Sequence, residues 1–174
     1  IKTDGQTGAP IPSTVLSIKS VTGSYSTSVT TGTDGSATLP ALPAGVYVVR
    51  EESVPEPYVV SHTEQTVALR PGKTSEVIFV DYEKPGLEIL KKNIATGEPI
   101  EGVTYLIEQI DGSYSTSATT DGAGRIFLDS IPVGSYRITE KNVPSHVILS
   151  EIPQEVHLEA GCTRTVTFFN AVKP

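Results

Sequence analysis

The sequence consists of two copies of one unit, which align without a gap. Residues 23–28 (GSYSTS) recur unchanged as residues 112–117. Three polar residues recur at a constant offset of 89 residues (91 − 2, 140 − 51 and 170 − 81): Lys2 as Lys91, Glu51 as Glu140, and Asp81 as Asn170. A period this long indicates whole domains in tandem, because solenoid repeats that share one core are much shorter. We therefore predict two domains, over residues 1–83 and 84–174.

The composition limits the size of each core and the kinds of partner. The chain has 174 residues and a formal net charge of −7. Each copy builds its core from fewer than about 90 residues, near the lower limit for independent folding. The acidic charge and the scattered Lys and Arg residues argue against nucleic acid and anionic membranes as partners. No apolar run approaches the roughly 18 residues that span a bilayer, so we predict no membrane insertion.

The two ends of the sequence interrupt the repeat. Copy two begins with residues 86–89, and the given sequence has no residues before Ile1 that correspond to them. Copy one continues through Lys84 and Pro85 into the next copy, whereas copy two stops at the corresponding Lys173 and Pro174. We therefore expect flanking repeats of the same kind as neighbours in a longer chain.

No conventional catalytic or metal-binding pattern is found. Cys162 is the single cysteine and replaces Lys73 of copy one in a turn, which favours a surface thiol over a nucleophile. His62, His146 and His157 each occur in one copy and lie in no Ser–His–Asp or metal-ligand spacing. We predict no turnover enzyme, no metal and no cofactor. A small domain without a disulfide or metal needs another staple, or is only marginally stable.

Short runs of β-branched and aromatic residues indicate an all-β fold. In copy one they include residues 14–18, 46–49 and 76–80, separated by turns that contain Gly and Pro. No stretch repeats apolar residues at helical spacing over a normal helix length. About seven short strands per copy fit a two-sheet sandwich, so we predict two tandem sandwiches.

Period-two alternation places the recurring polar residues on the apolar faces of their strands. In copy one, Glu51 shares a face with Tyr47 and Val49, and Asp81 shares a face with Phe79. Copy two follows the same pattern: Lys91 with Leu87 and Ile89, Glu140 with Tyr136 and Ile138, and Asn170 with Phe168. Isolated buried charges are very costly, so the three polar residues of each copy must face one another.

Two interpretations of this cluster are open on physical grounds alone. In the first, the three groups form a hydrogen-bonded cluster that only fixes the strand register. In the second, burial lowers the pKa of the lysine, whose neutral amine is a nucleophile. Burial also raises the pKa of a carboxylic acid, which can then polarise a neighbouring carbonyl. Because folding holds amine and carbonyl together, the product would be an isopeptide bond, with loss of ammonia from Asn or water from Asp.

Four motifs occur in the same order in both copies, and they are distributed over nearly the full length of each copy. Clear examples are LEILK at residues 87–91, TGEPI at 96–100, YVVRE at 47–51 and VTFFN at 166–170. These motifs resemble those of the Cna B-type (SpaA-like, prealbumin-like) repeats of Gram-positive surface adhesins and pilins. The resemblance implies a prealbumin-like, or reverse Ig-like, sandwich in each copy.

In that family a lysine of the first strand joins an Asn or Asp of the last strand, and a glutamate catalyses the reaction. The resemblance assigns these roles to two sets of residues: Lys2, Asp81 and the catalytic Glu51, then Lys91, Asn170 and the catalytic Glu140. Each glutamate acts once on its own chain, so the resemblance implies no enzyme in the usual sense.

The family also implies a mechanical role. We expect a structural stalk or spacer module of an extracellular, cell-wall-associated protein of a Gram-positive bacterium. Its partners would be flanking repeats of the same chain, and a host surface protein or glycan reached through other domains. The alternative is a ligand-binding adhesin domain, because the Ser/Thr-rich residues 24–33 are suited to contact a host protein or glycan. Since the core of this segment occurs in both copies, we interpret it as an exposed strand face of a scaffold.

Three positions depart from the family pattern. Asp81 stands where Asn is commoner, a variant that the family also uses, and Val147 stands where the motif has Tyr. Lys2 follows only Ile1, so we expect fraying to leave Lys2 less well buried than Lys91.

Overall fold

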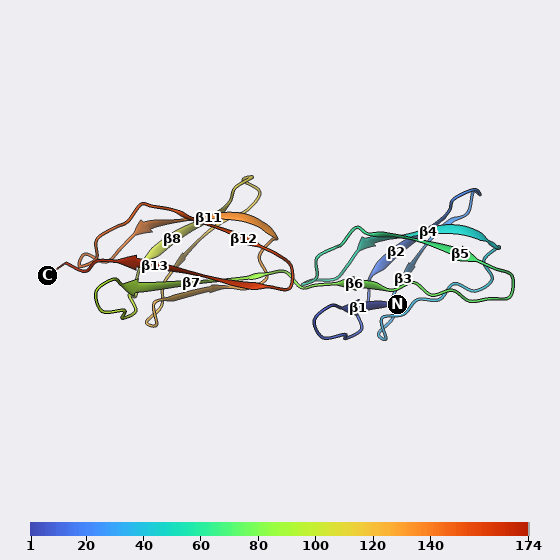
Figure 1. Cartoon of the computed structure of the whole chain (residues 1–174), viewed down its shortest axis with the longest axis horizontal. Helices are drawn as coiled ribbons and strands as arrows, with labels where there is room; N and C mark the ends of the chain where they lie inside the picture. Colours follow the sequence, from blue (N-terminus) through green and yellow to red (C-terminus); the bar gives the residue numbers. More distant parts are fainter. Residues whose placement is uncertain (174) are drawn as a thin grey trace. The chain divides into compact units, whose positions relative to one another are not determined.

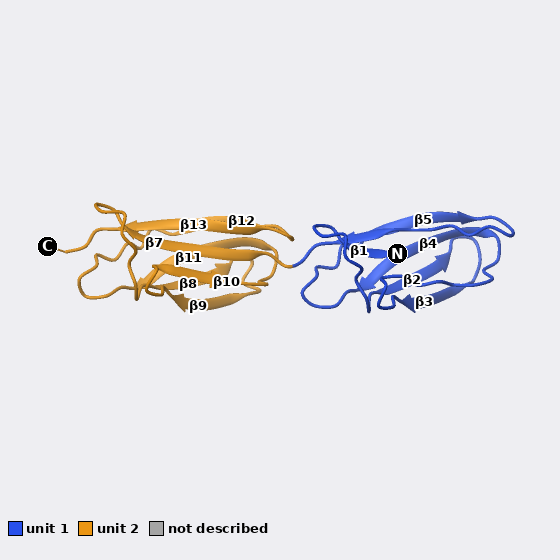
Figure 2. Ribbon diagram, turned by 90° about the horizontal axis from the view of Figure 1, so that it is seen from below, with its two compact units in different colours: residues 1–83 blue, residues 84–174 orange. Residues whose placement is uncertain are grey.

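The computed structural model describes residues 1–173. The chain divides into two compact units, Ile1–Glu83 (unit 1) and Lys84–Pro174 (unit 2), shown in Figure 2. The described residues form strands and loops without a helix, so no helical segment among them is long and apolar enough to cross a membrane. Each unit is a sandwich of two sheets, as the strand patterns predict (Figure 1).

Unit 2 has seven strands in two sheets. They are β7 (Gly86–Asn93), β8 (Thr104–Gln109), β9 (Ser115–Thr119), β10 (Arg125–Leu128), β11 (Gly134–Asn142), β12 (Gln154–Leu158) and β13 (Thr163–Asn170). One sheet has the order β10-β7-β13 and the other β12-β11-β8-β9. The first strand, β7, is antiparallel to β10 but parallel to the last strand, β13.

Unit 1 repeats this plan with six strands. They are β1 (Lys2–Asp4), β2 (Val15–Ser20), β3 (Ser26–Thr30), β4 (Gly45–Ser53), β5 (Glu64–Leu69) and β6 (Phe79–Asp81). One sheet has the order β3-β2-β4-β5, and the other consists of β1 and β6, which are parallel. The Ser/Thr-rich segment of copy one includes the edge strand β3.

Unit 1 differs from the predicted seven strands because its first strand is short. In unit 2, residues 87–90 pair with β10, and residues 86–90 pair with the beginning of β13. Ile1 corresponds to Leu90 (90 − 1 = 89), so unit 1 has no counterparts of Gly86–Ile89. Residues 36–39 and 74–78 therefore lack a partner strand and have irregular structure.

The same difference appears in the two cores. In unit 2, Leu87 and Ile89 are fully buried between the sheets, within a core of fourteen buried apolar residues. The corresponding core of unit 1 contains five: Leu16, Ile18, Tyr47, Val49 and Phe79. A groove of about 710 Å³ with mixed polar and apolar walls lies beside these residues, and Ile1 and Val77 also line it.

Candidate functional site

Both sheets of each unit contribute to one buried polar cluster. In unit 2, Lys91 lies on β7 and Asn170 on the adjacent β13, while Glu140 lies on β11 of the opposite sheet. The parallel register pairs Lys91 with Phe168, two residues before Asn170, so the Lys and Asn side chains are diagonal neighbours on one face. Unit 1 brings together Lys2, Glu51 and Asp81 from β1, β4 and β6 in the same way.

All six of the predicted site residues are buried. The exposed fraction of the residue is 0% for Lys2, 0% for Glu51 and 1% for Asp81. In unit 2 it is 1% for Lys91, 1% for Glu140 and 4% for Asn170. Alternation along each strand therefore predicts the direction of these side chains correctly. The expectation that fraying exposes Lys2 is wrong. The Ile1 ammonium donates to the Val77 carbonyl oxygen at 2.8 Å, and this contact extends the pairing of β1 beyond Lys2.

In unit 1, the lysine lies between two carboxyl groups. Lys2 Nζ is 2.5 Å from Glu51 Oε1 and 2.7 Å from Asp81 Oδ1. The buried ammonium therefore forms an ion pair with each of the two carboxyl groups. The other oxygen, Glu51 Oε2, accepts hydrogen bonds from the Ser61 backbone N–H at 3.0 Å and the Ser61 hydroxyl at 2.9 Å.

In unit 2, the glutamate bridges the lysine and the asparagine. Lys91 Nζ donates to Glu140 Oε2 at 2.6 Å, and Asn170 Nδ2 donates to Glu140 Oε1 at 2.5 Å. Oε1 also accepts from the Ser150 backbone N–H at 3.0 Å, and Oε2 from the Tyr105 hydroxyl at 3.2 Å. The carbonyl oxygen of Asn170 is buried and has no hydrogen-bond partner among the described residues.

The environment shifts the pKa of Lys91 in unit 2 and the pKa of Asp81 in unit 1 towards their reactive forms. Burial lowers the pKa of Lys91, although the hydrogen bond and charge of Glu140 oppose this effect. The Lys91 ammonium also lies 5.8 Å from the ring centres of both Tyr105 and Phe168. Burial raises the pKa of Asp81, although contact with Lys2 opposes it. A neutral lysine is a nucleophile, and a protonated Asp carboxyl can be attacked, whereas its carboxylate resists attack.

A carboxyl group that donates a proton should have a raised pKa, but the pKa of Glu51 is lowered. Burial alone would raise this pKa, but the contacts with Lys2 and Ser61 outweigh it, and the net effect is a lowered pKa. In unit 1 the carboxyl group whose pKa burial raises is that of Asp81, and the lowered pKa of Glu51 favours a role as a base.

The lowered pKa of Lys91 predicts a pH dependence for an unlinked unit 2. In Asn170→Ala no bond to residue 170 can form, and the amine stays buried. The pKa of Lys91 in the folded unit is below its ordinary value of 10.5, which the unfolded chain retains. Between these two values the unfolded state binds more protons, so the free energy of unfolding rises with pH. We expect this rise as the pH approaches 10.5 from below, with a slope of at most about 1.4 kcal/mol per pH unit.

Hydrogen exchange of the β11 amides would measure this dependence in unit 2 alone. The control is Lys91→Met in the same Asn170→Ala background, which removes the titrating amine and flattens the profile. A free energy of unfolding that falls over this pH range would contradict the prediction.

A glycine fixes the backbone of each lysine. Lys91 N–H donates to the Gly124 carbonyl oxygen at 2.7 Å, and Lys2 N–H donates to the Gly35 carbonyl oxygen at 2.7 Å. Gly124 has φ of +66°, and a Cβ atom there would lie 2.5 Å from the Lys91 carbonyl oxygen. Any larger residue would therefore displace the strand that holds the lysine.

Three further residues of the site were not predicted from the sequence. Ser61 and Ser150 occupy corresponding positions (150 − 61 = 89), and both donate a backbone N–H to the glutamate. Their shared offset is a signal that sequence reasoning could have used. Tyr105 has no such signal, because the corresponding residue in copy one is Leu16 (105 − 16 = 89).

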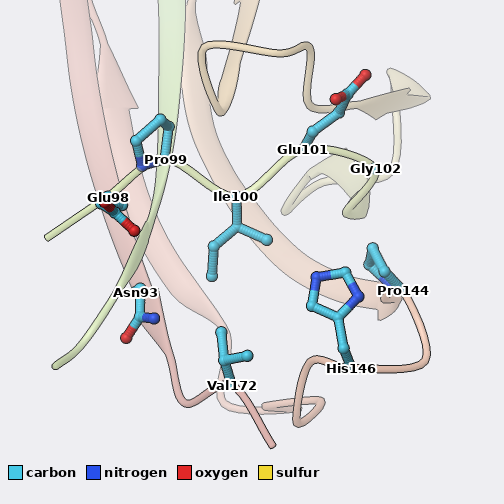
Figure 3. Close-up of a pocket in the computed structure, with 9 residues that line it drawn as sticks. All are labelled: Asn93, Glu98, Pro99, Ile100, Glu101, Gly102, Pro144, His146 and Val172. Carbon is cyan, nitrogen blue, oxygen red and sulfur yellow. The ribbon is translucent and has the colours of Figure 1, made fainter. Parts of the chain in front are cut away.

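A surface hollow of about 620 Å³ also lies in unit 2. Figure 3 shows His146 and Pro144 on one side of it, and Glu98 and Pro99 on the other, with Ile100 between them. Of the described residues that line the hollow, none belongs to the buried Lys–Glu–Asn cluster. The lone thiol, Cys162, is exposed, as its turn position predicts.

Solved structures with the same fold include several pilins. The shaft pilin spaA from Lactobacillus rhamnosus GG is 17% identical, with a TM-score of 0.51 over 99% of this chain and 96% of the pilin. The Streptococcal ancillary pilin is 17% identical, with a TM-score of 0.50 over 100% of this chain and 61% of that chain. The Bacillus anthracis TIE protein is 21% identical, with a TM-score of 0.51 over 99% of this chain but only 33% of that protein.

The sequence comparisons give the family. No curated protein sequence matches the chain at a significant level. The model of the SpaA family, described as a prealbumin-like fold domain, matches twice, over residues 1–83 and 85–172. These two matches cover nearly the whole chain, which therefore belongs to the SpaA family of prealbumin-like fold domains.

Proposed function

We propose that each unit forms one intramolecular isopeptide bond, Lys2–Asp81 in unit 1 and Lys91–Asn170 in unit 2. The observation that carries the proposal is the burial of each lysine together with its glutamate and the Asp or Asn of the last strand. Lys2 Nζ lies 2.7 Å from Asp81 Oδ1, and the carbonyl oxygen of Asn170 has no hydrogen-bond partner among the described residues. Buried charges are costly even when they are paired, and a lysine–aspartate amide replaces an ammonium and a carboxylate by one neutral group.

In unit 2 the two oxygens of Glu140 face the two nitrogens of the reaction. The Lys91 ammonium first gives a proton to Glu140, which leaves a neutral amine and a neutral acid. The amine attacks Cγ of Asn170, so a C–N bond forms while the bond from Cγ to Nδ2 breaks. The Glu140 carboxyl group then gives a proton to Nδ2, which leaves as ammonia, and takes the surplus proton from Nζ. The atoms balance as amine plus amide giving a new amide plus ammonia.

Unit 1 carries out the corresponding reaction with a second carboxyl group. Glu51 Oε1, 2.5 Å from Lys2 Nζ, accepts a proton from the ammonium. The neutral amine attacks Cγ of the protonated Asp81, and the Asp81 hydroxyl takes a proton from Nζ and leaves as water. The atoms balance as amine plus carboxylic acid giving an amide plus water.

Each bond would join the first and last strands of its unit and support a mechanical role. Treated like a disulfide, a cross-link that closes a loop of roughly 80 residues stabilises a domain by about 4–5 kcal/mol in the chain-entropy model. That is a large share of the typical 5–15 kcal/mol net stability of a small domain.

The similar structures include shaft and ancillary pilins. We infer that the chain is a stalk or spacer module of an extracellular, cell-wall-associated protein of a Gram-positive bacterium. Three statements stay predictions: that repeats of the same kind flank these units, that other domains of the protein bind a host protein or glycan, and the alternative that these units themselves bind a host ligand.

The intact mass of the folded chain tests both bonds at once. We expect the mass to fall short of the sequence mass by one ammonia and one water. A chain with the full sequence mass would overturn the proposal. Loss of ammonia alone would restrict it to unit 2, and loss of water alone would restrict it to unit 1. Peptide mapping then places each bond on its two residues.

A further inference from the structure

We propose that Tyr105 is a positioning residue for Glu140 and that the asparagine chemistry of unit 2 depends on it. This inference rests on the proposed isopeptide function and adds a fourth residue to that site in one unit only. Tyr105 would act through the glutamate, because the structure gives its hydroxyl a contact with Glu140 and with neither end of the new bond.

Tyr105 and Glu140 are directly opposite each other on β8 and β11. The Tyr105 side chain is fully buried, and its ring packs against that of Phe168 at a tilt of 46°, with centres 4.8 Å apart. Its hydroxyl donates to Glu140 Oε2 at 3.2 Å. Burial raises the pKa of this phenol, so the hydroxyl keeps its proton and stays a donor.

With Tyr105 in place, each oxygen of Glu140 has one fixed donor and one reacting group. Oε2 accepts from the Tyr105 hydroxyl and faces Lys91 Nζ, at 3.2 Å and 2.6 Å. Oε1 accepts from the Ser150 N–H and faces Asn170 Nδ2, at 3.0 Å and 2.5 Å. Donors on both oxygens restrain rotation of the carboxyl group, so each oxygen stays opposite the nitrogen whose proton it exchanges.

Unit 1 shows why its own reaction does not need this donor. Leu16 occupies the position opposite Glu51, so no hydroxyl is available there. Both fixed donors come from Ser61 and bind the same oxygen, Glu51 Oε2. The reacting Asp81 is itself a carboxyl group, 2.7 Å from Lys2 Nζ, and can hold a proton. An asparagine cannot do this, so in unit 2 a single carboxyl group must serve both nitrogens.

The test is the rate of Lys91–Asn170 bond formation in Tyr105→Phe. This change removes the hydroxyl and leaves the ring that packs against Phe168. The chain is made by cell-free synthesis, quenched with acid at intervals, and mapped for both cross-links by mass spectrometry. Losing one hydrogen bond to a charged group is expected to slow the bond by about tenfold to a hundredfold. The Lys2–Asp81 bond of the same molecules should form at its unaltered rate.

Tyr136→Phe is the matched control. Tyr136 is also a fully buried tyrosine of unit 2, but its hydroxyl donates to the Pro132 carbonyl oxygen at 2.7 Å, outside the Glu140 cluster. This control is expected to leave the rate of the Lys91–Asn170 bond within about twofold of the unsubstituted chain, because Glu140 keeps all of its partners.

A second pair of variants separates positioning from a general structural role. Tyr105→Phe is compared in the Asn170→Asp background, where a second carboxyl group replaces the amide. If Tyr105 positions Glu140 for the reaction of an asparagine, removing the Tyr105 hydroxyl should slow the bond between Lys91 and residue 170 by less than about threefold in this background. A structural role would slow both reactions equally, and that result would overturn the inference, as would an unaltered rate in Tyr105→Phe alone. If the unsubstituted chain forms no Lys91–Asn170 bond, the proposed function fails and this inference fails with it.

Discussion

Replacing Glu140 with glutamine is expected to leave Lys91 and Asn170 unjoined, while the Lys2–Asp81 bond still forms in the same chain. Glutamine keeps the volume of the side chain and an acceptor for the Ser150 N–H. It cannot take a proton from the lysine or return one to the leaving ammonia, and loss of a general acid–base group typically costs a factor of about 10² to 10⁴ in rate. Mass spectrometry should show the loss of one water and no loss of ammonia.

The two copies provide reciprocal controls for this experiment. Glu51→Gln is expected to give the mirror result, with loss of ammonia and no loss of water. Glu155→Gln changes an exposed glutamate that pairs with Arg137 at 2.9 Å on the surface of unit 2, and both bonds should form. Recovery of the Lys91–Asn170 cross-linked peptide from Glu140→Gln would refute the role of Glu140.

Stretching single molecules should give the second large effect. A pull on both ends of the chain enters each unit at its first strand and leaves at its last. In the unsubstituted chain the proposed amides would join these strands, so the 79 residue steps between Lys2 and Asp81 (81 − 2), and between Lys91 and Asn170 (170 − 91), would not extend. At about 3.4 Å per residue, each blocked bond would release roughly 270 Å of chain when its unit unfolds.

The number of extension steps should follow the number of blocked bonds. The unsubstituted chain is expected to show no step of this length, Glu140→Gln one step, and the double variant Glu51→Gln/Glu140→Gln two. A step of roughly 270 Å in the unsubstituted chain would show that at least one unit lacks its covalent bond.

The sequence predicts the fold well where strands can pair within the given chain. The all-β sandwich and the direction of the six polar side chains follow from period-two alternation, because one face of each strand must be buried. The same reasoning overestimates the strand at residues 76–80, of which only Phe79 and Val80 lie in β6. Strand propensity alone does not form a strand without a partner, and the partners in unit 2 have no counterpart before Ile1.

The site is predictable only in part. Repetition in both copies identifies Lys, Glu and the Asp or Asn, and burial explains why they meet. Repetition cannot identify Tyr105, which occurs in one copy only. The direction of the pKa shift at Glu51 depends on its contacts with Lys2 and Ser61, and these are known only once the loop after β4 is placed. The exposure of Lys2 was wrongly predicted because backbone pairing of Ile1 closes the strand end.

The parallel pairing of the first and last strands also bears on what a single break in the backbone would do. An amide between them turns each unit into a closed ring with two short tails. A protease that cuts once in an exposed loop of unit 2, such as residues 121–123, would open this ring. The two new ends would still be connected through the side chains of Lys91 and Asn170. A nicked array would therefore remain one continuous molecule, and everything beyond the cut would stay attached to whatever holds the other end.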